Sequence, residues 1–434
     1  MNPFLDRPLE NSILSGDLKV LGGSYIPDTL PHREEQIQKL VYRLESIMRN
    51  INPSNLLIYG RTGSGKTSTV AHVTSMLSEA LPGKISVKIL NCQVYDSIYS
   101  IMVTLVNSLS TDEDQSIPLS GWTLDRIYTE LIRRMESREI YLLIVLDEID
   151  KLVQKNGSDP IYVLLKLADD LKRKNSSLIG ITNYIGFVEG LDARVQSRLS
   201  QETIMFPPYN AVELRDIIKY RVNGVVKNDA IEDSAISLCA AIAAQEHGDA
   251  RKALDLMRMS IEIAIREGME KITEKEVARA KDMLEINVLR ETIKGLPVHS
   301  KFVLLSSVLS QEISRRPSFT GEVYDNYCAI CGELGYSPLT SRRVGDILSD
   351  LDDSGLIVTK IANLGRHGRT RYVEVGEKHE EMKKYILEED QFSGFHGQKI
   401  GRQTRFDADW PDKDRKGPSA DDISSATMDP ESIG

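Results

Sequence analysis

The chain has 434 residues, of which 41% are hydrophobic and 27% are charged. This length favours two or three domains, and the composition excludes a fibrous or wholly disordered protein. The formal net charge of −10 argues against a protein that coats nucleic acid indiscriminately, although a local basic patch is compatible with DNA binding. No apolar run approaches the length of about 18 residues of a membrane span, and no signal peptide is evident, so we expect a cytoplasmic protein without a membrane segment.

The first half of the chain has the pattern of an α/β domain. After a polar arm at 1–20, short apolar runs alternate with helical patterns over 21–206, which predicts a parallel sheet with flanking helices. Beyond Pro207 the pattern is helical throughout, so 207–284 is expected to form an all-helical lid. The predicted strands are NLLIY (55–59), VKIL (87–90), YLLIVL (141–146), LIGIT (178–182) and TIMF (203–206).

A separate unit is expected over 285–388. Helical patterns are followed by two strand-like runs, LIVTKIA and TRYVEV, and three helices with a β-hairpin are the parts of a winged helix. The remaining residues, 389–434, are polar with few aliphatic side chains and are expected to be a disordered tail. The predicted helices of this unit are 299–312, 320–334 and 340–353.

Four cysteines are present, and two of them form the CxxC sequence Cys328–Cys331. Cys92 and Cys239 stand in apolar contexts and are expected to be buried. No second pair or neighbouring histidine cluster completes a zinc site around the CxxC sequence. The pattern therefore favours a structural role for Cys328 and Cys331 and leaves a metal or redox role open.

The strand predicted at 55–59 leads into GRTGSGKT, which matches the phosphate-loop pattern G-x-x-x-x-G-K-[ST]. Glycines allow the backbone N–H groups to surround phosphate oxygens at the N-terminus of the next helix. Lys66 is expected to contact the β- and γ-phosphates, and the hydroxyl of Thr67 to ligate Mg²⁺. The residues predicted to bind nucleotide here are Gly60, Thr62, Gly63, Ser64, Gly65, Lys66, Thr67 and Ser68.

An acidic pair, Asp147-Glu148, follows the buried run at 141–146. A carboxylate at the C-terminal end of a parallel strand lies beside the phosphate crevice of such a sheet. Asp147 suits the coordination shell of Mg²⁺, and Glu148 suits a general base that aligns the attacking water. ATP or ADP and Mg²⁺ are therefore the predicted cofactors, and ATP hydrolysis is the expected activity.

The acidic pair after a phosphate loop resembles the AAA+ class of ATPases. This resemblance implies that Asn183, at the end of LIGIT, orients water between the γ-phosphate and the acidic pair. LDARVQSRLS is similar to the arginine-finger segment of the class, in which Arg198 is the finger and Arg194 the alternative; a finger contacts the γ-phosphate of a neighbouring subunit. GDARKALDLM resembles the second sensor of the lid, so Arg251 is expected to face the γ-phosphate.

The sequence FPPYNAVELRDIIKYR (206–221) joins the predicted sheet to the lid. In similar proteins, the residue at Tyr209 packs near adenine and the residue at Arg221 contacts the nucleotide from the lid. Pro-Pro-Tyr also suits a packed hinge, so a purely structural role for Tyr209 stays open.

A more specific resemblance joins several of these segments. YIPDTLPHREEQIQKL (25–40) is similar to the segment before the phosphate loop in the origin-recognition and cell-division-control initiator family, in its archaeal branch. The apolar helix and polar loop near 96–121 fit the helical insertion of that family, although the same residues suit an ordinary core. The resemblance covers about 20–385 and implies a nucleoid-associated replication initiator. It also implies that the partners are double-stranded origin DNA, the MCM replicative helicase and other initiator subunits.

Basic residues mark a candidate DNA surface on the winged helix. Exposed arginines at the start of the helix 340–353 suit bidentate contacts with guanine, and the loop 363–371 has basic residues without an acidic one. Whether these arginines read bases or contact phosphates stays open, as does a winged helix that binds protein instead. The predicted DNA-binding residues are Ser341, Arg342, Arg343, Arg366, His367, Arg369 and Arg371.

Two other functions share many of these motifs. A clamp-loader ATPase has the acidic pair and the finger but lacks a C-terminal winged helix. An ATP-gated transcription regulator would combine nucleotide and DNA binding at promoters rather than at replication origins.

Overall fold

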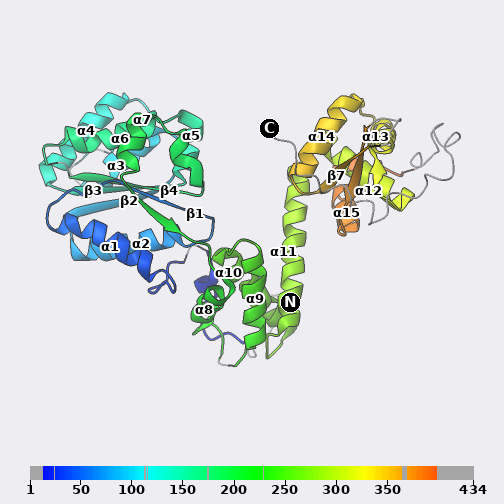
Figure 1. The fold of residues 1–434 in the computed structure, drawn as a ribbon, viewed down its shortest axis with the longest axis horizontal. Helices are drawn as coiled ribbons and strands as arrows, with labels where there is room; N and C mark the ends of the chain where they lie inside the picture. Colours follow the sequence, from blue (N-terminus) through cyan, green and yellow to red (C-terminus); the bar gives the residue numbers. More distant parts are fainter. Residues whose placement is uncertain are drawn as a thin grey trace, which may run out of the picture. The chain divides into compact units, whose positions relative to one another are not determined.

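A computed structural model shows two compact units, which divide between Lys281 and Asp282 (Figure 1). Within the described residues, no helix combines the length and the apolar composition needed to cross a bilayer. The structure describes residues 13–23, 25–111, 114, 116–173, 175–227, 229–363 and 369–397.

Five parallel strands form the sheet of the first unit, in the order β2-β3-β4-β1-β5. All five apolar runs predicted as strands are strands. Strands β1, β4 and β3 are parallel neighbours in this order. The loops that follow them therefore lie next to one another at the same edge of the sheet. The bounds are β1 (Leu56–Gly60), β2 (Ile85–Asn91), β3 (Tyr141–Asp147), β4 (Ser176–Thr182) and β5 (Glu202–Phe206).

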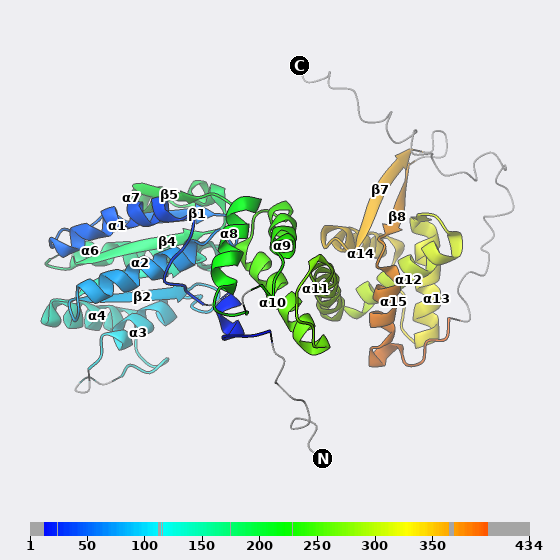
Figure 2. The same cartoon turned by 90° about the horizontal axis from the view of Figure 1, so that it is seen from below.

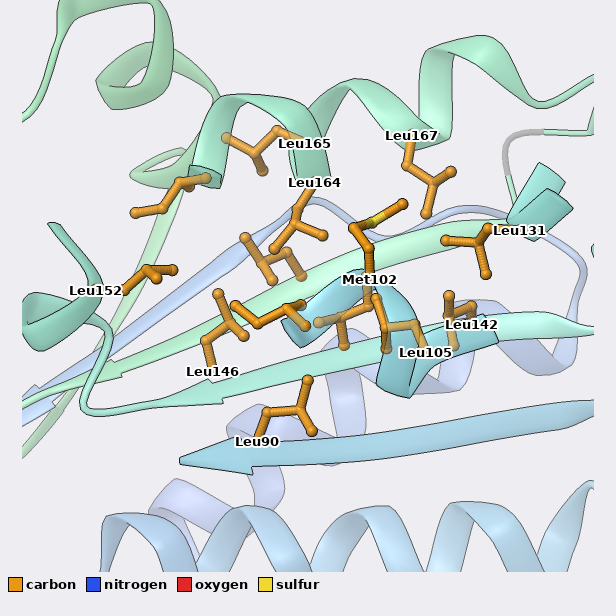
Figure 3. Packing of buried hydrophobic residues seen from close by; sticks show 14 of the residues in the cluster. Leu90, Met102, Leu105, Leu131, Leu142, Leu146, Leu152, Leu164, Leu165 and Leu167 are labelled. Atoms are coloured by element: carbon orange, nitrogen blue, oxygen red, sulfur yellow. The ribbon is translucent and has the colours of Figure 1, made fainter. Parts of the chain in front are cut away.

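Helices cover both faces of this sheet (Figure 1). One face packs against α1 (Glu34–Met48) and α2 (Lys66–Ala80). On the other face, leucines of β2 and β3 pack against side chains of the helices, as Figure 3 shows for Leu90 and Met102. The helices of this second face are α3 (Ile98–Ser108), α4 (Leu124–Arg138), α5 (Ile149–Asn156), α6 (Asp159–Asp170) and α7 (Ala193–Leu199).

Helix α3 belongs to the segment that resembles the initiator insertion. Five of its apolar side chains are part of the hydrophobic core, because each of these is at most 1% exposed, whereas Ile98 is partly buried. The five side chains form ordinary core, so we expect any contact of this segment with DNA to come from the polar loop after the helix. The buried side chains are Ile101, Met102, Val103, Leu105 and Val106.

The lid is helical, as predicted. Its last helix, α11, continues to Gly295 past the expected boundary at 284, because neither glycine nor proline interrupts EINVLRETIK. The N-terminal arm packs on this lid: Leu14 pairs with Val226, and the N–H group of Lys227 donates to the carbonyl of Ile13 at 2.8 Å. The lid helices are α8 (Ala211–Val222), α9 (Asp233–Gln245), α10 (Ala250–Glu267) and α11 (Glu274–Gly295).

The second unit is a winged helix, in which β7 and β8 form the hairpin (Figure 2). The three predicted helices and two predicted strands are present. The two-residue strand β6 and the helix α15 were not predicted. The elements are α12 (Val298–Ser314), β6 (Ser318–Phe319), α13 (Thr320–Leu334), α14 (Ser341–Asp353), β7 (Ile357–Asn363), β8 (Arg369–Val375) and α15 (His379–Leu387).

Residues 389–397, which the composition assigned to the disordered tail, pack on the winged helix. Phe392 is 3% exposed, and its ring meets Phe302 edge to face at 5.3 Å between centroids. The buried ammonium of Lys301 donates to both carboxylate oxygens of Glu389 at 2.7 Å. These contacts correct the expected tail boundary, since one aromatic ring and one ion pair order a segment whose composition is polar.

On α13, Cys331 is buried and Cys328 is partly buried, and both thiols are free. Burial raises the pKa of both thiols, which disfavours the reactive thiolate form. These surroundings agree with a structural role for the CxxC sequence.

Candidate nucleotide site and nucleic-acid interface

The phosphate loop connects β1 to α2 and is closely packed against the lid. Gly63 and Gly65 have φ angles of 70° and 84°, which L side chains rarely adopt. A Cβ atom at Gly63 would lie 1.8 Å from a carboxylate oxygen of Asp249, and one at Gly65 would lie 2.7 Å from the hydroxyl of Tyr209. Glycine is therefore required at both positions by backbone conformation and by space.

Lys66 is a buried cation held by three oxygen atoms. Its Nζ atom donates to the carbonyls of Gly60 and Arg61 and to Oδ1 of Asn183, each at 2.8 Å. The pKa of Lys66 is lowered to about 8, mainly by burial; Asp147 opposes this shift and Arg251 contributes to it. A desolvated ammonium group at the centre of a glycine-rich loop is suited to an anionic ligand, which would restore its ordinary pKa.

The acidic pair lies beside the same loop. The hydroxyl of Thr67 donates to Oδ2 of Asp147 at 2.9 Å, so the two predicted Mg²⁺ ligands are adjacent. Glu148 has a φ angle of 55°, and its Oε2 atom is buried without a hydrogen-bond partner in the described part of the chain. A hydroxyl and a carboxylate oxygen form a donor set that Mg²⁺ accepts, so these residues fit the ion.

A pocket lies between the phosphate loop, the edge of the sheet, the lid and the segment that follows the N-terminal arm. Most of the predicted nucleotide-site residues line this pocket, whereas Gly60 and Ser64 are absent from its lining. Sequence reasoning missed the side formed by Gly22 to Pro31, for which the only signal was the resemblance of 25–40. The predicted residues in the lining are Thr62, Gly63, Gly65, Lys66, Thr67, Ser68, Asp147, Glu148, Asn183, Tyr209, Arg221 and Arg251.

Arg221 lines the pocket, but its N–H groups are directed to the N-terminal segment. Nε donates to the carbonyl of Val20 at 2.7 Å and Nη2 to that of Gly22 at 3.0 Å. The guanidinium carbon lies 4.9 Å from the ring centroid of Tyr25. These bonds fasten the N-terminal segment at the pocket, and the nucleotide contact expected of Arg221 stays a prediction.

The two finger candidates lie on α7, and neither lines the pocket of its own chain. Arg198 pairs with Asp169 at 2.6 Å. Arg194 donates twice to the carboxylate of Asp192, at 3.0 Å each. Both pairs are solvent-exposed and therefore weak, so either arginine is able to exchange its partner for a phosphate of another molecule.

The pKa of Lys66 leads to a testable pH dependence. The dissociation constant of ADP should be constant below about pH 7 and rise up to about tenfold per pH unit above about pH 8, because the ammonium group then loses its proton. The folding stability of the free protein should change in the opposite direction. Between about pH 8 and 10.5 Lys66 is deprotonated in the folded chain but still protonated in the unfolded chain, so the free energy of unfolding should rise with pH in this range. Calorimetric titrations with ADP measure the first effect, and Lys66→Arg should flatten it. Equal affinities at about pH 7 and 9.5 for the wild type would contradict the prediction.

The winged helix presents the start of α14 to solvent. Ser341, Arg342 and Arg343 are exposed, whereas the stripe formed by Val344, Ile347, Leu348 and Leu351 is buried. Two tyrosines of α13 fix the residue before the helix cap. Tyr327 accepts a hydrogen bond from the N–H of Leu339 at 3.0 Å, and Tyr324 donates to its carbonyl at 3.1 Å. The predicted basic residues of α14 are therefore placed by a rigid support.

The wing residues have different outcomes. Arg366 and His367 lie outside the described residues, and for Arg369 the structure describes the backbone of β8 alone. Arg371 turns toward α14, where Nη1 donates to Oγ of Ser349 at 2.9 Å. This bond braces the hairpin against α14, so we expect Arg371 to support the wing rather than to contact DNA.

This brace predicts a difference between two arginines of the same strand. Arg371→Ala should lower the melting temperature and leave the salt dependence of duplex binding unchanged, whereas loss of a phosphate contact reduces the slope of log K against log salt by about 0.9. Arg369→Ala, the matched variant, should show that reduction. Binding titrations over a series of salt concentrations measure both slopes, and a smaller slope for Arg371→Ala would assign it to the DNA surface after all.

The sheet, the phosphate loop, the acidic pair and the helical lid define an AAA+ ATPase fold, followed here by a winged helix. Family models agree: residues 29–179 match an AAA ATPase domain, 215–282 the Cdc6 AAA+ ATPase-type lid domain, and 291–385 the CDC6 C-terminal winged helix domain.

The chain is 51% identical over 411 residues to the ORC1-type DNA replication protein of Picrophilus torridus, which covers 95% of this chain and 99% of the relative. Identity to the ORC1-type DNA replication protein 2 of Thermoplasma acidophilum is 51% over 406 residues, or 94% and 99% of the two chains. The solved structure of the Aeropyrum pernix ORC1 protein in complex with DNA superposes with a TM-score of 0.73 at 34% identity, covering 88% of this chain and 98% of that one. The chain therefore belongs to the family of archaeal ORC1-type DNA replication proteins, the Orc1/Cdc6 initiators.

Proposed function

We propose that this chain is an ATP-controlled replication initiator that binds duplex DNA at origins and helps recruit the MCM replicative helicase. The proposal depends on two features that occur in one chain. A nucleotide pocket lies between the sheet and the lid, and the exposed first turn of α14 in the winged helix carries two arginines. The DNA complex of the Aeropyrum pernix relative supports duplex binding by this fold.

In the nucleotide site, the N–H groups of the phosphate loop and Lys66 would hold the phosphates, and Thr67 with Asp147 would hold Mg²⁺. The ion, when bound, neutralises charge on the phosphate oxygens. Glu148 would accept a proton from water through Oε2, which has no hydrogen-bond partner among the described residues, and Asn183 would orient that water from the end of β4. Arg251 would face the γ-phosphate from the lid. Gly22, Gly23 and Tyr25 line another side of the pocket.

An arginine of α7 would complete this site in a second initiator subunit. Arg198 is the first candidate and Arg194 the alternative, since both are exposed and held by weak ion pairs. Hydrolysis by an isolated subunit is then slow. The nucleotide state would control whether the phosphate loop and the lid are held together. Through the lid, it would also control whether the winged helix binds DNA.

On the DNA surface, Ser341, Arg342 and Arg343 would enter the major groove, and Arg366, His367 and Arg369 of the wing would contact phosphates or the minor groove. The polar loop after α3 would provide a further contact with DNA. The complex would work on the chromosome of a cell without a nuclear envelope.

Selection of bound sequences from a randomised duplex library, with the full chain and with ATP or ADP, tests this proposal. Repeated elements that map beside a replication start, together with retention of MCM by the complex, are the expected result. Selection of promoter elements alone would favour the ATP-gated transcription regulator. Preference for primer–template junctions over continuous duplex would favour the clamp-loader reading.

A further inference from the structure

Arg33 is a buried arginine that none of the site assignments above uses. It is 2% exposed and lies directly before α1. Nε donates to the carbonyl of Ser64 at 2.9 Å, Nη1 to that of His32 at 2.8 Å, and Nη2 to that of Pro207 at 2.7 Å. Its guanidinium carbon lies 3.7 Å from the ring centroid of Tyr209. Burying a charge among neutral groups is costly, so an arginine in this position needs an explanation beyond packing.

The surroundings of this guanidinium contain carbonyls and rings rather than an acid. Across the described residues, no carboxylate lies within ion-pair distance of it, and Glu34 and Glu213 act on it only at longer range. Desolvation lowers the pKa of Arg33, although arginine remains charged in proteins. Carbonyl acceptors in three directions match the planar fork of a guanidinium, which a lysine ammonium on a flexible stem does not reproduce.

The contact with Ser64 affects the direction of a loop N–H group. The carbonyl of Ser64 and the N–H of Gly65 belong to one peptide group, and in a trans peptide they point in opposite directions. Arg33 holds the carbonyl from the buried side, and Ser64 is 1% exposed and absent from the pocket lining, whereas Gly65 lines the pocket. The N–H of Gly65 is thereby directed to the side where a phosphate loop binds its anion.

The contact with Pro207 connects the same guanidinium to the lid. Pro207 is the first residue after β5, and Tyr209, stacked on Arg33, donates its N–H to the carbonyl of Gly248 at 3.3 Å. A Cβ atom at Gly248 would lie 2.2 Å from the carbonyl oxygen of Tyr209, so the two segments are in close contact. One side chain thus contacts the phosphate loop and the connection from sheet to lid.

We propose that Arg33 is a positioning residue that fixes the Ser64–Gly65 peptide with its N–H toward the phosphates and ties the phosphate loop to the lid connection at Pro207. The inference rests on the nucleotide binding proposed above and adds the residue that orients the loop. It acts through the backbone of Ser64 and Pro207, since Nε and Nη2 donate to their carbonyls, and it is absent from the pocket lining.

Titration of the full-length variants Arg33→Lys and Arg33→Gln with ADP and with adenosine tests this role. The dissociation constant of ADP should rise about 10- to 100-fold, the range for losing hydrogen bonds from a charged donor, because the phosphate loop is no longer oriented. That of adenosine should stay within about twofold. Arg134→Lys is the matched control: Arg134 is also 2% exposed, lies in α4 and donates to Glu130 and the carbonyl of Val106. It should lower the melting temperature without changing ADP affinity.

Unchanged ADP affinity in both Arg33 variants, or equal losses for ADP and adenosine, would overturn the inference while leaving the proposed function intact. A wild-type chain that does not bind ADP would refute the proposed function and this inference with it. If neither variant folds, hydrogen exchange of the wild type decides: ADP should slow exchange at Tyr209 and Asn210 together with 63–66. Slower exchange at 63–66 alone would overturn the proposed tie to the lid.

Discussion

Replacing Glu148 with Gln should reduce ATP turnover by about 10²- to 10⁴-fold while the dissociation constant of ATP changes by less than about threefold. The substitution keeps the size and shape of the side chain and replaces the proton-accepting carboxylate with a neutral amide. Single-turnover measurement of phosphate release, beside equilibrium binding of labelled ATP, separates the two quantities. The expected pattern is loss of chemistry without loss of binding.

The backbone at Glu148 supports this role. A φ angle of 55° is uncommon for a residue other than glycine and costs about 1–3 kcal/mol, so the surrounding structure must enforce it. Glu148 precedes α5 without a side-chain capping bond, and its Oε2 atom is buried without a partner among the described residues. Because this oxygen has no partner in the described part of the chain and the side chain does not cap α5, it is available to a water molecule in the pocket.

Glu139→Gln is a suitable control, because Glu139 has a similar φ angle of 53° but lies at the end of α4 in an exposed pair with Arg173. It should leave turnover and binding unchanged. Retained turnover in Glu148→Gln would remove the general-base assignment, and a large rise in the dissociation constant of ATP would show that Glu148 supports the pocket rather than the reaction.

The sequence predicted the fold well where burial determines the pattern. The inner strands β1, β3 and β4 were visible as continuous apolar runs, because a parallel strand covered on both faces has few polar positions. The edge strands β2 and β5 are less buried and were visible as the shorter runs VKIL and TIMF. The stripe on α14 was visible because Val344, Ile347, Leu348 and Leu351 recur at helical spacing. Strand β6 has two residues and so offers no periodicity, and Phe392 gave no pattern at all because a single aromatic residue anchors its segment.

Site residues were likewise predictable from the sequence only where a local pattern marks them. The phosphate loop and the acidic pair were found because their chemistry depends on adjacent residues. Arg33, Arg221 and Arg371 have roles that depend on backbone carbonyls or hydroxyls far along the chain, such as Ser64 for Arg33 at a separation of 31 residues. A sequence shows that an arginine is present but does not show which oxygen it meets. Charge and motif alone therefore gave no sign of the intramolecular bonds that Arg221 and Arg371 make.

The double substitution of Arg342 and Arg343 with Ala should abolish selection among duplex sequences. A bidentate contact with a base is worth about 1–3 kcal/mol of discrimination, so two such contacts account for about 10²- to 10⁴-fold if they add. The exposed side chains lie in the first turn of α14, whose position is fixed by its buried stripe and by the two tyrosines that hold Leu339. The substitution should therefore remove side-chain contacts without moving the helix.

The control removes the same charge from the same unit. Arg290→Ala with Lys384→Ala takes two cations from α11 and α15, both of which pair with Glu388. Comparison of selected and random duplexes at several salt concentrations then separates base reading from charge. The α14 variant should lose the preference for the selected sequence, and the control should keep it.

If Arg342 and Arg343 contact phosphates instead, affinity for selected and random duplexes falls by the same factor and the salt slope decreases by about 2. Selectivity would then have to come from the wing, the loop after α3 or the shape of the DNA. Unchanged selectivity, affinity and slope would exclude the start of α14 from the DNA surface. A winged helix that binds protein would then be the better description of the second unit, because the exposed arginines at the start of α14 would have no role on the duplex.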